Sequence, residues 1–315
     1  MTERQLPAHI AAALAGRPTR GPGGNTADSA GQPWAGRDLS GPENPLHAFD
    51  DDDGRADPRL TTAVAGLLAQ PTDETLGDHS ALDQAGRPGS GERGIVAALT
   101  TARVFIPIVA QLGVAGEARG AGTRSASSSE LHSDKEADMA LVTLDAPDGR
   151  KALPIFSSTL ALQRWHPEAR PVAAYASRAA LAAVADGAEL LVLDPGADLT
   201  VVVRRPALWA LAQQLPWTPS YEDPALAALV EVAALGQEEI LSVALRPAGG
   251  VLTRSADGSI AFGGGPGPEL RMDVQLRPGL TAQGVRDAVG TLRATLLGRQ
   301  DFVERVDSLD IKLIS

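Results

Sequence analysis

The chain has 315 residues, a formal net charge of −11 and no cysteine. The lack of cysteine excludes disulfides, thiolate nucleophiles, cysteine-based zinc sites and iron–sulfur clusters. The acidic balance argues against nucleic acid as a partner, because binding to phosphates requires a surplus of basic side chains. Aromatic residues make up only 3% of the chain, so Phe156 and Trp165 are scarce large side chains that we expect to anchor packing.

Residues 1–56 are rich in glycine and proline and show no hydrophobic period. Such a segment buries too little apolar area to offset its ordering entropy, so we predict a disordered N-terminal arm. The N-terminus lacks the basic and apolar segments of a secretory signal. No apolar stretch in the sequence reaches the length that spans a bilayer. We therefore expect a cytoplasmic protein without a membrane partner.

Residues 57–214 are predicted to form one α/β domain. Asp57 and Pro58 suit the first turn of a helix, and a second helix passes into a buried strand over residues 104–109. Two hairpins are indicated, one turning at Pro147-Asp148-Gly149 and the other at Asp194-Pro195-Gly196. Ser157 or Ser158 can cap the short helix that follows the first hairpin. Helices alternating with hairpins and crossovers predict helices packed on a mixed sheet.

Residues 215–223 read as a proline-rich linker, and residues 224–315 as a smaller domain. Asp223-Pro224 and Thr281 each suit the beginning of a helix. Apolar and polar residues alternate over 270–277, which predicts a strand with its polar face toward water. The sequence "LDIKLIS" from Leu309 alternates again and predicts a closing strand. The predicted fold class is α+β: a mixed sheet with antiparallel hairpins, followed by a smaller two-layer α+β domain.

Two motifs fail as cofactor sites. An EF-hand loop with its glycine at Gly54 would place Phe49 and Leu60 at the first and twelfth positions, where oxygen ligands are required. The glycines of "FGGGPGP", residues 262–268, are interrupted by prolines and do not lead into a helix, as a dinucleotide fingerprint must. The sequence therefore predicts no cofactor, no metal site and no catalytic residue.

The charged cluster of Lys135, Glu136 and Asp138 has two interpretations. Directly before a hairpin it suits a solvated, ion-paired lip. Alternatively, the three side chains bind a ligand together with Phe156 and Trp165. An acid–base role would need burial or close charges to shift their pKa values.

Five stretches occur in an order that resembles the SseB-type proteins, in particular their actinobacterial branch. They are "HAFDDDDGRADPRL", "RVFIPIVAQLG", "DKEADMALVTLDAPDGRKALPIFSS", "LQRWHPEARPV" and "GAELLVLDPG". The resemblance runs over residues 47–214 and implies the SseB N-terminal domain. It implies no catalytic residue, because the biochemical activity of that family is undefined.

These observations predict a non-catalytic adaptor or binding module for a protein partner or a small ligand. The alternative, suggested by the serine-sensitivity phenotype behind the family name, is a small-ligand sensor or enzyme of amino-acid metabolism with a site near residues 135–138. The closing strand of the C-terminal domain is an edge through which the chain can form a homo-oligomer.

Overall fold

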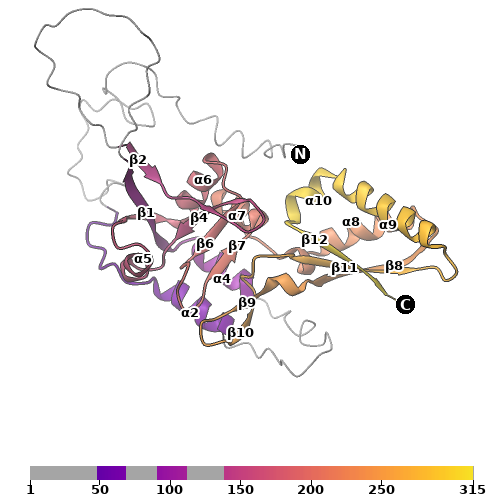
Figure 1. Cartoon of the computed structure of the whole chain (residues 1–315), viewed down its shortest axis with the longest axis horizontal. Coiled ribbons are helices and arrows are strands. Elements are labelled where there is room, and N and C mark those ends of the chain that lie inside the picture. Colours follow the sequence, from indigo (N-terminus) through magenta and orange to yellow (C-terminus); the bar gives the residue numbers. More distant parts are fainter. Residues whose placement is uncertain (1–47, 69–90, 112–137, 315) are drawn as a thin grey trace, which may run out of the picture.

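The computed structural model describes residues 48–68, 91–111 and 138–314, drawn in colour in Figure 1. The N-terminal arm up to residue 47 and the side chains of residues 110, 111 and 138–140 lie outside this description. In the described ranges, every helix is too short or too polar to cross a bilayer. The fold is α+β, as predicted.

The helices are α2 (Pro58–Leu68), α4 (Gly91–Leu99), α5 (Thr159–Trp165), α6 (Ala176–Ala185), α7 (Arg205–Ala212), α8 (Pro224–Leu235), α9 (Ala282–Leu297) and α10 (Gln300–Arg305), with the 3-10 turns η2 (Ser220–Glu222) and η3 (Gly249–Val251). The strands are β1 (Arg103–Gln111), β2 (Asp138–Leu141), β3 (Leu144–Asp145), β4 (Lys151–Ile155), β5 (Arg170–Tyr175), β6 (Leu190–Leu193), β7 (Val201–Val203), β8 (Ile240–Pro247), β9 (Leu252–Arg254), β10 (Ile260–Phe262), β11 (Leu270–Leu276) and β12 (Leu309–Ile314).

Two small sheets form the first half of the molecule. One has the order β2-β1-β5 and is antiparallel, and the other has the order β3-β4-β6-β7. Strands β4 and β6 are parallel, whereas β3 and β7 pair antiparallel with them. An isolated antiparallel bridge between Phe105 and Phe156 joins the two sheets. The helices therefore pack on what is in effect one mixed sheet.

Both predicted hairpins are present. Gly149 has φ of 82° at the first turn, and Asp194 and Gly196 have positive φ at the second. The first hairpin is shorter than expected, because its first strand divides. Its beginning, β2, pairs with β1, and only Leu144 and Asp145 pair with β4.

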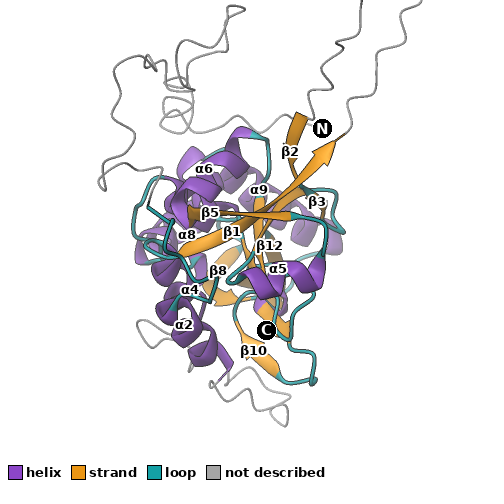
Figure 2. Cartoon of the chain, turned by 90° about the vertical axis from the view of Figure 1, so that its left-hand side faces the viewer, coloured by secondary structure: helices purple, strands orange, loops and turns teal. Residues whose placement is uncertain are grey.

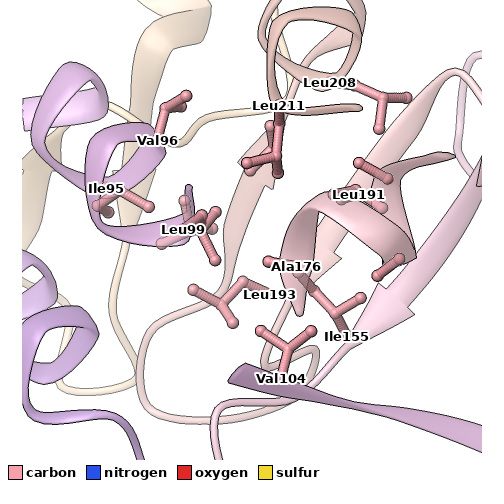
Figure 3. Packing of buried hydrophobic residues seen from close by; sticks show 14 of the residues in the cluster. Ile95, Val96, Leu99, Val104, Ile155, Ala176, Leu191, Leu193, Leu208 and Leu211 are labelled. Atoms are coloured by element: carbon pink, nitrogen blue, oxygen red, sulfur yellow. The ribbon is translucent and has the colours of Figure 1, made fainter. Parts of the chain in front are cut away.

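Side chains alternate between the two faces of this sheet. One face is covered by α2, α4, α6 and α7, with the buried core shown in Figure 3. On the other face, Phe105 and Phe156 pack against Leu162 of α5. In Figure 2, α5 and α6 lie on opposite sides of β1.

The second half of the chain is a two-layer unit. Its sheet has the order β12-β11-β8, with β8 antiparallel and β12 parallel to β11. Asp223 caps α8 by accepting from Ala225 N–H, and Thr281 caps α9 by accepting from Gly284 N–H, as predicted. On β11 the apolar side chains are buried against the helices. Arg271, expected to face water, is instead buried, and its guanidinium forms an ion pair with Asp273 two residues along the same strand.

Residues 248–268 leave this unit and pack against the first one. Hairpin β9–β10 contacts α2 (Figure 1), and Ala261 is part of the first unit's core. The glycines of this segment allow close approach of backbone. A Cβ on Gly265 would lie 2.3 Å from the Leu252 carbonyl and 2.4 Å from the Gly250 carbonyl. The glycine-rich run therefore fits one piece of backbone against another.

A buried ion pair between Glu92 and Arg204 lies where the two units meet. Gly264 N–H donates to Glu92 Oε1 (2.8 Å), and Arg204 Nη1 donates to the Gly265 carbonyl (2.6 Å). The Tyr221 hydroxyl donates to Glu92 Oε2 (3.3 Å). Burial, and then the charge of Glu92, raise the pKa of Tyr221 above its ordinary value, so the phenol stays a neutral donor.

We predict that Glu92→Gln destabilises the whole chain. The substitution leaves the Arg204 charge buried without its counter-ion, and breaking a buried pair in this way costs about 3–5 kcal/mol. Denaturant unfolding of the variant measures this loss. The matched control is Arg55→Gln, because the Arg55–Asp53 pair is exposed to solvent and 3.6 Å apart. Equal midpoints for the two variants would contradict the role given to Glu92.

We also predict that Gly265→Ala destabilises the junction between the units. The added methyl group collides with two backbone carbonyls that cannot move independently, and such overpacking costs about 1–3 kcal/mol or more. Gly249→Ala is the control, since a Cβ there meets no atom within 4 Å. A Gly265→Ala melting temperature within error of that of Gly249→Ala would refute the close-approach argument.

Candidate functional site

A groove of about 280 Å³ lies between α5 and the β6–β7 turn. Its walls combine apolar and polar side chains. From α5 and its cap come Ser158, Leu160, Ala161, Arg164 and Trp165, and from the turn come Pro195, Gly196, Ala197 and Asp198. Leu160 is 54% exposed although it is a large apolar residue. A cationic and an anionic side chain therefore line the same groove as exposed apolar surface.

Local signals fix the position of α5. The Ser158 hydroxyl accepts a hydrogen bond from Ala161 N–H (3.1 Å) and caps the helix, as one of the two predicted serines. Leu162 of α5 is fully buried in the same cluster as Phe156. The Trp165 ring lies 5.2 Å from the Phe156 ring, between centroids. The Phe156 ring thus supports the indole at the wall of the groove.

The other wall is a turn held by its own hydrogen bonds. The Asp194 carboxylate accepts from Ser157 N–H (2.7 Å), which ties the turn to the segment that precedes α5. Thr200 Oγ1 donates to the Asp194 carbonyl, and Gly196 N–H donates to Thr200 Oγ1, each at 3.2 Å. Burial raises the pKa of Asp194 above its ordinary value, although the hydrogen bond from Ser157 lowers it. The groove therefore has a rigid wall whose carboxylate is not free to move into it.

The groove lies at the carboxyl ends of two adjacent parallel strands. β4 ends at Ile155 and β6 at Leu193, and these two residues are partners in the parallel register. Ser158 and residues 195–198, from the segments that follow these strands, line the groove together with α5. In sheets with parallel strands, ligands bind in the crevice outside such carboxyl ends. The topology therefore points to this groove as the candidate binding site.

The structure brings two of the five predicted ligand-binding residues together. Phe156 and Trp165 are in contact, with Phe156 fully buried and Trp165 lining the groove. Lys135 and Glu136 lie outside the described residues. Asp138 begins β2 and is the partner of Gln111 on β1. Gln111 lies six residues along β1 from Phe105, the residue that bridges to Phe156. At 3.3 Å per residue, this separation along the strand is about 20 Å. Ligand binding by this set stays a prediction.

The sequence analysis missed Leu160, Arg164 and the β6–β7 turn as site residues. The turn was predicted as a turn and α5 as a helix, but nothing local to either segment shows that they face each other. No simple β-α-β signal was available either, because β5 lies between β4 and β6 in the chain and pairs with β1 instead.

The acidic run at residues 50–57 has structural partners. Asp52 accepts from Gly54 N–H (2.8 Å) and from Arg103 Nε (2.6 Å), which holds the run to β1. Asp57 accepts from Arg59 N–H in the first turn of α2. Among the described residues, no group of three or more acidic or histidine side chains is arranged to hold a metal ion.

We predict that Asp194→Asn stabilises the protein at neutral pH. A raised pKa means that the folded protein binds the proton more tightly than the unfolded chain, so ionisation above that pKa costs stability. Asparagine accepts the Ser157 hydrogen bond without the charge and tolerates the φ of 50°. The melting temperature of the variant should exceed that of the wild type at pH 7, and the gap should close as the pH falls toward about 4.

Asp148→Asn serves as the control of opposite sign. Against the raising effect of burial, hydrogen bonds from Arg150 lower the pKa of Asp148. This variant should therefore melt below the wild type at pH 7. A gap for Asp194→Asn that is negative, or constant with pH, would contradict the assignment.

Comparison with known proteins identifies one region. Residues 79–210 match the family described as the SseB protein N-terminal domain. No curated protein and no solved structure matches the chain. The matched region contains both walls of the groove and both members of the Glu92–Arg204 pair. The predicted resemblance to the SseB N-terminal domain is thus confirmed over residues 79–210.

Proposed function

We propose that this chain is a non-catalytic binding protein whose SseB N-terminal domain holds a small ligand in the groove between α5 and the β6–β7 turn. The observation that carries the proposal is the groove itself, about 280 Å³ at the carboxyl ends of β4 and β6. Pockets for small molecules span about 300–1,000 Å³, so a ligand of this groove is at the small end of that range.

The lining suits recognition of a compact ligand with both an apolar and a polar part. Trp165 and Leu160 offer apolar surface, whereas Arg164 and Asp198 offer opposite charges. An indole can also hold a flat or cationic group against its ring face. A ligand that carries an apolar body and a charged end fits this combination.

Binding describes the groove better than catalysis. Proton transfer calls on an acid or base held away from water or beside a close charge. Arg164 and Asp198 are exposed to solvent, and the Ser158 hydroxyl already caps α5. The sensor or enzyme with a site near residues 135–138 remains the alternative to be tested beside the groove.

We predict that Ala197→Phe abolishes binding. The test begins with thermal shifts of the full chain against amino acids, nucleosides, short carboxylates and short peptides. A ligand that binds only the folded state raises the melting temperature with its concentration. Phenylalanine at the exposed position 197 fills the groove without a cost in core packing, so the shift should disappear.

Leu160→Ser is a second test of the groove, and Leu235→Ser is its matched control. Both leucines are exposed, at 54% and 85%, but only Leu160 lines the groove. Affinity should fall about tenfold in Leu160→Ser, which corresponds to about 1.4 kcal/mol, and stay unchanged in Leu235→Ser. A shift that survives Ala197→Phe but is lost in Lys135→Ala or Asp138→Ala would move the site to the charged cluster. The absence of a shift across the panel would refute a small-ligand groove.

A further inference from the structure

The closing strand β12 is an edge strand. It pairs with β11 on one side, and no other strand of the described residues pairs with it. Its last two residues, Leu313 and Ile314, are 48% and 39% exposed. An edge strand offers a row of backbone donors and acceptors to a further strand.

The register with β11 shows which residues of β12 have backbone N–H and C=O groups that point away from β11. Leu270 N–H donates to the Ser308 carbonyl (3.0 Å), and Leu270 is the partner of Leu309. In a regular parallel ladder, alternate residues bond to one neighbour and the residues between them point to the other side. Continuing this pattern, Asp310 and Lys312 bond to β11. The backbone groups of Leu309, Ile311 and Leu313 therefore point away from it.

The sequence of β12 is self-complementary about Ile311. Leu309 and Leu313 lie two residues on either side, and Asp310 and Lys312, of opposite charge, lie one residue on either side. Two antiparallel copies with a two-fold axis at Ile311 place Leu309 opposite Leu313 and Asp310 opposite Lys312. These pairs are favourable on both faces of the strand. The residues whose backbone points outward are also the ones that hydrogen-bond in this register.

The charges on the neighbouring strand β11 also complement those of the second copy. In the register of β11, Arg271 is the partner of Asp310 and Asp273 is the partner of Lys312. Across the two-fold axis, the row on the face opposite the helices would read Arg271, Asp310, then Lys312 and Asp273 of the second copy. Positive and negative charges alternate along the whole row. On the face covered by helices, the apolar row formed by Met272 and Ile311 would be extended across the axis by Ile311 and Met272 of the second copy.

We propose that two copies of this chain form a symmetric dimer by antiparallel pairing of β12 with β12, centred on Ile311. The interface is isologous, because the same strand serves both copies. One strand pair buries less than the roughly 1,600 Å² of a standard interface, so the dimer belongs to the weak, concentration-dependent class.

The test uses two charge variants of the full chain, Asp310→Lys and Lys312→Asp. Each variant alone places like charges opposite each other at two positions of the interface, and should be monomeric. Mixed in equal amounts, the two variants restore opposite charges at both positions and should form a heterodimer. Sedimentation equilibrium from micromolar to millimolar concentration measures the mass against the 32.5 kDa of one chain.

The mixture separates the proposal from simple misfolding, because misfolded variants would not associate specifically when combined. Arg246→Asp, a charge reversal on the other edge strand of the same sheet, is the control and should dimerise like the wild type. The proposal is overturned by a monomeric wild type at millimolar concentration. It is equally overturned by single variants that stay dimeric, or by a mixture that stays monomeric.

Discussion

The ion pair between Glu92 and Arg204 is the contact on which the arrangement of the two halves depends. A buried pair is tolerable only when its remaining donors and acceptors are satisfied. Part of that satisfaction comes from outside the segment that matches the SseB N-terminal domain, from Gly264, Gly265 and Tyr221. The first unit thus contains both charges, and the second supplies the groups that make their burial acceptable.

Much of the fold was predictable, because its signals are local. The turns at Gly149 and Asp194 and the helix caps at Ser158, Asp223 and Thr281 each involve residues within a few positions of one another. The role of Glu92 was not predictable. A glutamate in the first turn of a helix is ordinary, and its partners lie 112 and 172 residues away along the chain. The glycines at 263–265 were likewise recognised as unlike a nucleotide loop, but their close approach to other backbone needs the folded chain.

The difference between local signals and long-range contacts also explains why the sequence analysis did not find the groove. Lys135, Glu136 and Asp138 attracted the prediction because charges carry obvious chemistry. The groove is built from α5 and the turn at residues 195–198, whose side chains form no motif along the chain and come together only because β4 and β6 are adjacent and parallel. Of the five predicted ligand-binding residues, the described part of the chain places the two aromatic ones at the groove. Their scarcity marked Phe156 and Trp165 as anchors, and the ring contact between them supports the groove wall.

The groove and the β12 edge lie toward opposite ends of the long axis of the molecule, with α5 at one end and the C-terminus at the other (Figure 1). Pairing through β12 would therefore leave both grooves of a dimer open and far apart. Two separated sites on one particle gain affinity for a target that presents the same group more than once, provided that the spacing matches. The proposed ligand groove and the proposed weak edge-strand dimer are thus compatible. Dimerisation would raise the overall affinity of the two grooves for a target with repeated groups, and such a target would in turn favour the dimer, without any further contact.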